Sequence, residues 1–175
     1  MLGILQIKKM SIEDLNNTEA LKKMRKLVND IDFCMMLTDL ETQPISAIPM
    51  STKKVDEAGN IWFLSGKDSG HNANISKNSK TQLLYSDNSD MEFISIYGSA
   101  SIHTDKEIIH ELYSKSDDAW FDDKNDPNIT ALKFAPSEAY YWDTKQNKYI
   151  ALLKMGIATI TGDKADVSEK GKLNL

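Results

Sequence analysis

The sequence predicts an α+β fold that is mainly β, with one antiparallel sheet or barrel and helices at its periphery. Roughly six stretches have strand patterns and roughly three or four have helical ones, and the two kinds do not alternate as in a parallel sheet. The clearest strand pattern, 92–103, is long and half polar, and Gly98 interrupts it where a bulge or a close backbone approach would suit a curled sheet. The chain lacks the GxGxxG, Walker, HExxH and nucleophile-elbow motifs, which disfavours the folds that carry them.

Length and composition fit one globular domain. The 175 residues are 41% apolar and 27% charged, and no apolar run is long enough to span a bilayer. The net charge is −5 and the lysines are scattered among acidic residues, which disfavours a nucleic acid partner. The only cysteine, Cys34, excludes an intramolecular disulfide, and the first ten residues do not have the charge order of a secretory signal. We therefore expect a cytoplasmic protein with a lead-in at 1–17, one domain at 18–162 and a polar tail at 163–175.

The N-terminal part predicts a helix followed by a buried strand. In the lead-in, Ser11 and Asp14 have the spacing of a capping box for one short turn. An amphipathic helix is expected from Thr18, and its apolar stripe is Leu21, Met24, Leu27, Val28 and Ile31. The run 33–38 predicts a buried strand, in which Cys34 is a core residue because no nearby positive charge would lower its thiol pKa.

The stretch Pro44–Ile75 contains the most informative pattern. Ile45–Met50 alternates as a strand, Ile61–Ser65 has the composition of a buried strand, and Glu57–Asn60 supplies a turn that favours a hairpin between them. A helix is then expected to open at Ser69–His71. Its free backbone N–H groups and positive dipole end would suit an anion such as a phosphate, although a serine there equally fits an ordinary N-cap.

The middle of the chain adds strands and a second capped helix. A short helix is expected to end at 75–79, and strands at 81–86 and 92–103 follow it. Thr104 and Glu107 form a capping-box pattern for a helix. Its expected buried stripe is Ile108, Ile109, Leu112 and Tyr113.

Residues 114–128 are strongly acidic and are predicted to form a surface loop. Within it, Trp120 and Phe121 either pack against the domain and hold the loop in place or belong to a dimer face. Carboxylates in such a segment fit a solvated surface better than acid–base work, and we predict no catalytic residue.

The C-terminal part predicts two strand segments and a helix. The segments lie at 129–134 and 139–142, and Ala135–Pro136 is expected to break them apart. A helix is expected at 148–161, with Gly162 just after its end. The tail beyond it is expected to be loosely held.

A few side chains are candidates for binding. His71 is either a solvated loop residue or a donor to a phosphate beside the Ser69 hydroxyl, and Lys67 is either solvated or a second positive group there. His103 and His110 are expected to be structural, and the three histidines do not have the spacing of a metal triad.

Three consecutive aromatic residues end the last predicted strand of the domain. The ring of Trp142, with those of Tyr140 and Tyr141, either packs as core filler in the hydrophobic core or stacks against a flat ring of a bound ligand.

Five motifs occur together in a characteristic order. They are S-A-I-P-M at Ser46–Met50, V-D-E-A-G-N-I-W-F-L-S at Val55–Ser65, K-D-S-G-H at Lys67–His71, Y-Y-W-D at Tyr140–Asp143 and L-L-K at Leu152–Lys154. Each is degenerate, but the combination resembles the general stress protein branch of the pyridoxamine 5′-phosphate oxidase-like family. The resemblance extends from about Leu21 to Leu173.

This resemblance implies a split β-barrel that forms a homodimer and binds FMN, or alternatively FAD, in two clefts between the subunits. The strand Ser46–Ser51 would lie along the flavin ring, Phe63–Ser65 and Lys67–His71 would hold the ribityl chain and phosphate, and Trp142 would approach from the partner. The implied flavin-binding residues are Ile48, Pro49, Met50, Ser51, Phe63, Leu64, Ser65, Lys67, Ser69, His71 and Trp142.

Three positions depart from the family pattern. Ile48 stands where an arginine commonly reaches the phosphate, and His71 where a lysine is common. Losing an always-charged donor removes about 1.5–3 kcal/mol, so weakened FMN binding is expected. Asp143 follows Trp142, instead of the arginine and histidine that hold the substrate of true oxidases, which argues against vitamin B6 oxidation.

The predicted function is therefore FMN binding by a general-stress-type protein, with flavin-dependent oxidoreductase activity on an unidentified small molecule. The alternatives are a flavin-binding protein without turnover and a dimeric scaffold without cofactor.

Overall fold

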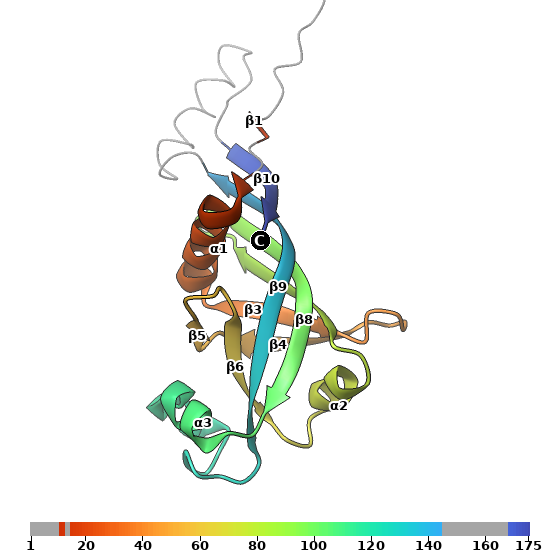
Figure 1. Cartoon of the computed structure of the whole chain (residues 1–175), viewed down its shortest axis with the longest axis vertical. Helices are drawn as coiled ribbons and strands as arrows, with labels where there is room; N and C mark the ends of the chain where they lie inside the picture. Colours follow the sequence, from red (N-terminus) through yellow and green to blue (C-terminus); the bar gives the residue numbers. More distant parts are fainter. Residues whose placement is uncertain (1–10, 13–14, 145–167) are drawn as a thin grey trace, which may run out of the picture.

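The strands form one curled, mainly antiparallel sheet in the computed structural model, which describes residues 11–12, 15–144 and 168–175 (Figure 1). The strands are β1 (Ser11–Ile12), β2 (Leu15–Asn16), β3 (Phe33–Thr38), β4 (Ser46–Ser51), β5 (Lys54–Val55), β6 (Ile61–Gly66), β7 (Lys80–Asp87), β8 (Glu92–His103), β9 (Ile129–Thr144) and β10 (Ser168–Asn174). The helices are α1 (Asn17–Ile31), α2 (Gly70–Lys77), α3 (Lys106–Leu112) and a 3₁₀ turn, η1 (Lys115–Ala119). The mainly β, antiparallel split-barrel prediction is confirmed.

The sheet follows the order β1-β10-β9-β8-β7-β3-β4, with β6 on β9 and β5 on β6. Two adjacent partners share one edge of β9: β6 pairs with residues 129–134, and β10 pairs with residues 138–144. On its other edge β9 pairs with β8, with a register shift at Tyr97/Gly98. The pairing skips Ser137, so the extra residue of the bulge is on β9 and not at Gly98. The close backbone approach expected at Gly98 is confirmed, because a Cβ there would lie 2.2 Å from the backbone oxygen of Ala135.

The expected break at Ala135–Pro136 is wrong, because β9 is continuous from Ile129 to Thr144. Pro136 falls between the residues that pair with β6 and those that pair with β10. A proline, which has no backbone N–H to donate, is tolerated where a strand lacks a partner on one edge.

A hairpin forms at the predicted turn, but it joins a different pair of strands from the predicted pair. β4 pairs with β3 and not with β6, and the hairpin joins β5 to β6. The Asp56 carboxylate closes its turn, because it accepts from the backbone N–H of Asn60 at 2.8 Å and from Trp62 Nε1 at 2.9 Å. Gly59 supplies the positive φ, 87°, that the turn requires.

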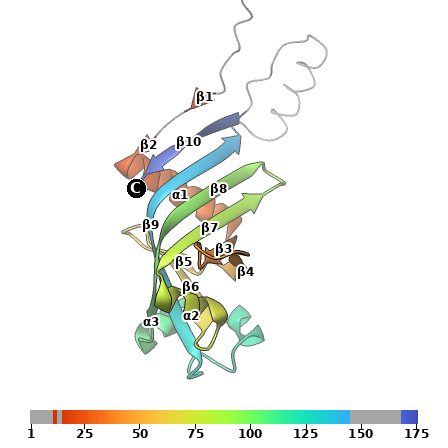
Figure 2. The ribbon, with the colours of Figure 1, turned by 90° about the vertical axis from the view of Figure 1, so that its right-hand side faces the viewer.

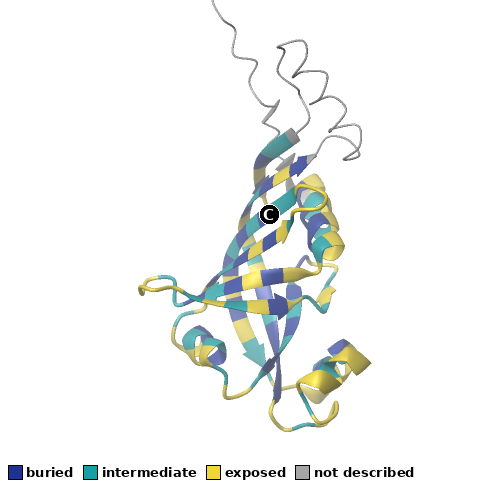
Figure 3. Ribbon diagram, turned by 180° about the vertical axis from the view of Figure 1, so that it is seen from behind, coloured by how far each residue is buried: buried dark blue, intermediate teal, exposed yellow. Residues whose placement is uncertain are grey.

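Helix α1 covers one face of the sheet and has the predicted stripe, with Met24, Leu27 and Val28 fully buried. Cys34 is buried as expected, and burial raises the pKa of its thiol to about 12. Figure 3 shows buried and exposed residues alternating along the strands, which indicates that one sheet face is the core. No helix in the described residues has the length and apolar character needed to cross a membrane.

A second, smaller core lies beneath α3, and here two details differ from expectation. The buried residues Ile109 and Leu112 come from the predicted stripe. The N-cap is Asp105 and not Thr104, because the Asp105 carboxylate accepts from the backbone N–H groups of Glu107 and Ile108. Phe121 packs against this core, but Trp120 is 83% exposed and does not pin the segment.

The two ends of the chain meet in the sheet. Strands β1 and β2 pair in parallel with β10, and the turn expected at Ser11–Asp14 includes residues 13–14, which lie outside the described residues. The tail is not wholly loose, because Ser168–Asn174 pairs with β9 as strand β10. The helix expected at 148–161, with Gly162, lies outside the described residues.

Lys23 joins α1 to this end of the sheet. Asp143 and Glu169 face each other across β9 and β10, and the Lys23 ammonium binds both carboxylates, Glu169 at 2.7 Å. Burial lowers the pKa of Lys23, but the bonds to Asp143 and Glu169 outweigh it, so the pKa is raised. Without Lys23 the two carboxylates would repel each other in a poorly solvated place.

We expect Lys23→Met to lower the free energy of unfolding by about 2 kcal/mol, as measured by urea unfolding. The matched control is Lys26→Met, because the Lys26 side chain is 54% exposed and its bonds to Asp30 and Glu92 contribute less than about 1 kcal/mol. Equal stability losses in the two variants would contradict the assignment.

Candidate functional site

A polar cluster lies where β6 ends, α2 begins and β9 starts. Ser65 Oγ lies 2.5 Å from His71 Nε2 and 2.8 Å from Asn72 Oδ1, and Ser69 Oγ lies 3.1 Å from His71 Nε2. Asn72 Nδ2 donates to Thr130 Oγ1 at 2.9 Å. Ser65, Asn72 and Thr130 are buried, so the cluster is a fixed part of the fold.

The bonds of this cluster determine which nitrogen of His71 carries a proton. The Thr130 hydroxyl donates to the backbone carbonyl of Ser65, so its oxygen accepts from Asn72 Nδ2. The Asn72 carbonyl then accepts the Ser65 hydroxyl proton, which leaves Ser65 Oγ to accept from His71 Nε2–H. His71 thus has its proton on Nε2, and Nδ1 is where a second proton would be added.

The same cluster presents donors suited to an anion. Ser69 is the N-cap of α2, and its hydroxyl accepts from the backbone N–H of Asn72 at 3.3 Å. The N–H groups of Gly70 and His71 make no hydrogen bond to any described residue. They lie at the positive end of the helix dipole, which favours a phosphate-like group. Burial lowers the pKa of His71, so in the free protein it is neutral at pH 7.

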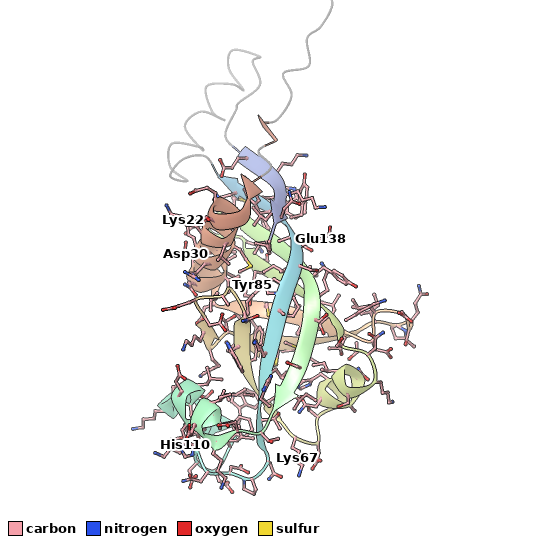
Figure 4. The ribbon with its side chains drawn as sticks, in the orientation of Figure 1. Lys22, Asp30, Lys67, Tyr85, His110 and Glu138 are labelled. Atoms are coloured by element: carbon pink, nitrogen blue, oxygen red, sulfur yellow. The ribbon has the colours of Figure 1, made fainter. Side chains whose placement is uncertain are left out.

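Lys67 is exposed in the loop before this helix, at the end of the molecule that holds α2 and α3 (Figure 4). Its backbone N–H donates to the carbonyl of Asn128 at 2.6 Å. The ammonium is therefore on an anchored loop near the cluster, where it adds positive charge at the protein surface.

Strand β4 runs along the free edge of the sheet path. Among the strands that the structure describes it pairs only with β3, so the backbone groups on its outer edge have no strand partner there. Pro49 and Ser51 are exposed, whereas Ile48 is half-buried and Met50 is buried. Asn74 of α2 donates to Thr38 Oγ1 at 3.1 Å, and Thr38 pairs with Ser46, so β4 begins close to α2.

Two of the predicted residues pack into the cores of the protein. Phe63 is fully buried in the main core, and Leu64 packs against the smaller core beneath α3. Their side chains hold β6 in place between the two cores.

Trp142 lies far from the cluster within one chain. Thr130 contacts Asn72 at one end of β9, and Trp142 stands twelve residues further along the same strand. At about 3.3 Å per residue this is about 40 Å, and Figure 1 shows β9 running most of the length of the molecule. The Trp142 ring lies 4.7 Å from that of Tyr140 and is 41% exposed, so it is not core filler.

Other candidates have different surroundings. The His103 ring lies 5.4 Å from that of Trp62, and its Nε2 lies 2.9 Å from Ser101 Oγ, which is a structural contact. His110 is exposed on α3. In the part of the chain that the structure describes, no group of three or more His, Cys, Asp or Glu side chains could hold a metal ion.

The sequence alone did not indicate Asn72 and Thr130, although both are buried in the cluster. An asparagine in a first helical turn and a threonine in a strand are ordinary residues there. Only the pairing of Ser65 with Thr130 across β6 and β9 brings them together.

Comparison with known proteins agrees with this architecture. The sequence profile of the family described as "Pyridoxamine 5'-phosphate oxidase like" matches residues 19–166. Among proteins with curated descriptions, none matches the chain.

Several solved structures share the fold. A structure from Jannaschia sp. CCS1 described as general stress protein 26 superposes with a TM-score of 0.75 at 24% identity, over 91% of this chain and 100% of that one. A general stress FMN/FAD binding protein from Xanthomonas citri has a TM-score of 0.63 at 26% identity, over 75% and 93% of the two chains. The chain therefore belongs to the pyridoxamine 5′-phosphate oxidase-like family, as its sequence motifs predicted, among that family's general stress proteins.

Proposed function

We propose that this protein is a cytoplasmic homodimer that binds FMN between its subunits and acts as a flavin-dependent oxidoreductase. The observation that supports it most directly is the cluster of Ser65, Ser69 and His71 at the N-terminus of α2. The Ser69 hydroxyl, the His71 imidazole and two backbone N–H groups without a partner among the described residues converge there, and together they suit a phosphate monoester. The flavin ring would follow the free edge of β4, with Pro49 and Ser51 exposed toward it. The FMN/FAD binding described for the Xanthomonas citri protein supports the same ligand class.

The distance between the cluster and Trp142 within one chain supports the homodimer. A mononucleotide cannot bridge the roughly 40 Å between the cluster and Trp142 of the same chain, so both can contact one flavin only if Trp142 comes from a partner.

An uncovered apolar surface supports the same dimer. Phe33, Met35, Leu84 and Trp142 are exposed. Their strand registers place them on the sheet face opposite the core, in adjacent rows across β3, β7 and β9. An exposed apolar patch of this kind is typical of a protein–protein interface.

When bound, a flavin would supply the hydride or electron chemistry. The chain's own residues would bind and orient it: His71 and the α2 amides the phosphate, and the β4 edge the ring. Ile48 offers no charge where the family commonly has arginine, so the phosphate depends more on His71.

The decisive experiment is an FMN titration of the purified protein, followed by flavin fluorescence and preceded by a visible absorbance spectrum. We expect saturable quenching at micromolar FMN or below, and His71→Ala is expected to weaken it by about tenfold. An absence of both bound flavin and quenching would contradict the proposal and leave a cofactor-free scaffold.

Turnover is tested separately. Reduced nicotinamide donors with a panel of quinones and nitroaromatics should give rates above those of free FMN. If they do not, the protein binds flavin without turnover.

FMN affinity is expected to depend on pH through His71. Its pKa is lowered by burial, so near pH 8 it is neutral, and a bound phosphate favours the protonated ring. Affinity should therefore rise about three- to tenfold as the pH falls from 8 to 6. Titrations of His71→Gln over the same range serve as the control, and an equal pH dependence in that variant would show that His71 is not responsible.

A further inference from the structure

Three buried side chains connect His71 to strand β9, at the end of the molecule where β9 begins and α2 lies (Figure 2). Thr130, Asn72 and Ser65 are each at most 3% exposed. Asn72 Nδ2 donates to Thr130 Oγ1 at 2.9 Å, and Ser65 Oγ donates to Asn72 Oδ1 at 2.8 Å. These three residues form a hydrogen-bond relay. Because it is shielded from water, each of its protons has a fixed place.

The direction of the relay is set at Thr130. Its hydroxyl donates to the backbone carbonyl of Ser65 at 3.0 Å, and a carbonyl can only accept. The Thr130 oxygen must then accept from Asn72, so the amide N–H of Asn72 faces Thr130 and its carbonyl faces Ser65. A valine at position 130 would have the same shape as the threonine, but it could not distinguish the two ends of the amide.

The other possible acceptors of the Ser65 proton are more distant. The carbonyl oxygen of Gly66 lies 3.4 Å from Ser65 Oγ and Ser69 Oγ lies 3.3 Å from it, against 2.8 Å for Asn72 Oδ1. Ser65 therefore donates to Asn72 and accepts from His71 Nε2–H. Nδ1 of His71, which makes no hydrogen bond to any described residue, is the ring nitrogen left for a ligand. In the neutral ring it is an acceptor.

The relay acts on His71 through the positions of protons and not through charge. Strand β6 contributes Ser65 and strand β9 contributes Thr130, which are both uncharged. Lys67 and Asp68, in the loop before α2, are exposed and have opposite charges. Burial lowers the pKa of His71. A bound anion is then the charge that favours a second proton on the ring.

We propose that Thr130 and Asn72 are positioning residues that hold His71 in its Nε2–H form, so that the site takes up a proton when it binds a phosphate monoester. A neutral Nδ1 and a phosphate oxygen are both acceptors, so a proton from the solvent must first be added to Nδ1. The opposite tautomer, with its proton already on Nδ1, would donate to the phosphate without any uptake. The phosphate part rests on the proposed function, whereas the assignment of the tautomer does not.

The first test measures the tautomer in the free protein. Long-range 1H–15N correlation spectra at pH 8 distinguish protonated from unprotonated ring nitrogens, and the His71 signals are those lost in His71→Gln. We expect the Nε2–H form in the wild type and in Thr130→Ser, which keeps the hydroxyl. Thr130→Val should give a mixture of both tautomers, because the Asn72 amide can then turn around. A second variant, Asn72→Ala, removes the acceptor of the Ser65 proton and should shift His71 in the same direction.

Thr81→Val is the matched control. Thr81 is also fully buried, and its hydroxyl donates to the backbone carbonyl of Ser79 at 3.1 Å, outside the relay. This variant loses a buried hydroxyl of the same kind, but it should leave the tautomer of His71 unchanged.

The second test counts protons. The three- to tenfold rise in FMN affinity expected from pH 8 to 6 corresponds to an average uptake of about 0.25–0.5 proton per FMN. Isothermal titration calorimetry at pH 7, in two buffers of different ionisation enthalpy, measures this uptake. Thr130→Val should reduce it at least about twofold, and Thr81→Val should not change it.

The inference is overturned if the wild type carries its His71 proton on Nδ1, or if folded Thr130→Val stays entirely in the Nε2–H form. Equal proton uptake by Thr130→Val and the wild type would also overturn it. If FMN does not bind the wild type, the proposed function fails, and the spectra of the free protein still decide whether Thr130 and Asn72 position His71.

Discussion

A heterodimer that joins one His71→Ala subunit to one Trp142→Ala subunit is expected to bind one FMN with wild-type affinity and to lose tight binding of the second. In the proposed dimer each site takes His71 from one subunit and Trp142 from the other, because the two ends of β9 are about 40 Å apart. One site of this heterodimer then has both residues and the other has neither. Differently tagged subunits allow its purification, and a fluorescence titration counts the tight sites.

The matched control carries both substitutions on one subunit, with a wild-type partner. Each of its sites then lacks one residue, so neither should bind with wild-type affinity. The reverse result, with the intact site in the control, would show that His71 and Trp142 serve the same flavin from one chain and would contradict the shared site.

Replacing Gly98 with alanine is expected to lower the free energy of unfolding by about 3 kcal/mol, and Tm by about 10 °C. A Cβ at this position would lie 2.2 Å from the backbone oxygen of Ala135 and 2.8 Å from the Phe134 ring. The first neighbour is backbone, so β8 and β9 must separate locally, at the point where the register shifts. Urea unfolding of the purified variant measures the loss.

Gly66→Ala is the control for this substitution. It adds the same methyl group in β6, where a Cβ would meet nothing within 4 Å, and should change stability by less than about 0.5 kcal/mol. If both variants lose the same stability, the effect comes from removing a strand glycine in general and not from the close approach at Gly98.

Local sequence patterns were sufficient to predict much of the fold. The β3 bounds, the α1 stripe and the Ser69 cap of α2 are features of consecutive residues, because periodicity and capping act within a few positions. The Thr104 cap failed at the same scale, since Asp105 competes for the same N–H groups one residue later.

Strand pairing was harder to infer from local patterns. Ile45–Met50 and Ile61–Ser65 flank a turn, yet β4 pairs with β3 and β6 pairs with β9. Pro136 resembles a strand break, but it occupies the gap between two partners of one continuous strand. Pairing depends on residues distant in the chain, and a single sequence contains no direct record of them.

By itself, the sequence determined the family, the mainly β antiparallel fold and the loop in which Ser65, Ser69 and His71 meet, because motifs and short-range periodicity specify them. Only the tertiary structure decided that Asn72 and Thr130 complete the cluster, and that Trp142 lies at the opposite end of β9. The physical reason is that a sheet places residues side by side through long-range backbone hydrogen bonds, which local sequence patterns do not encode.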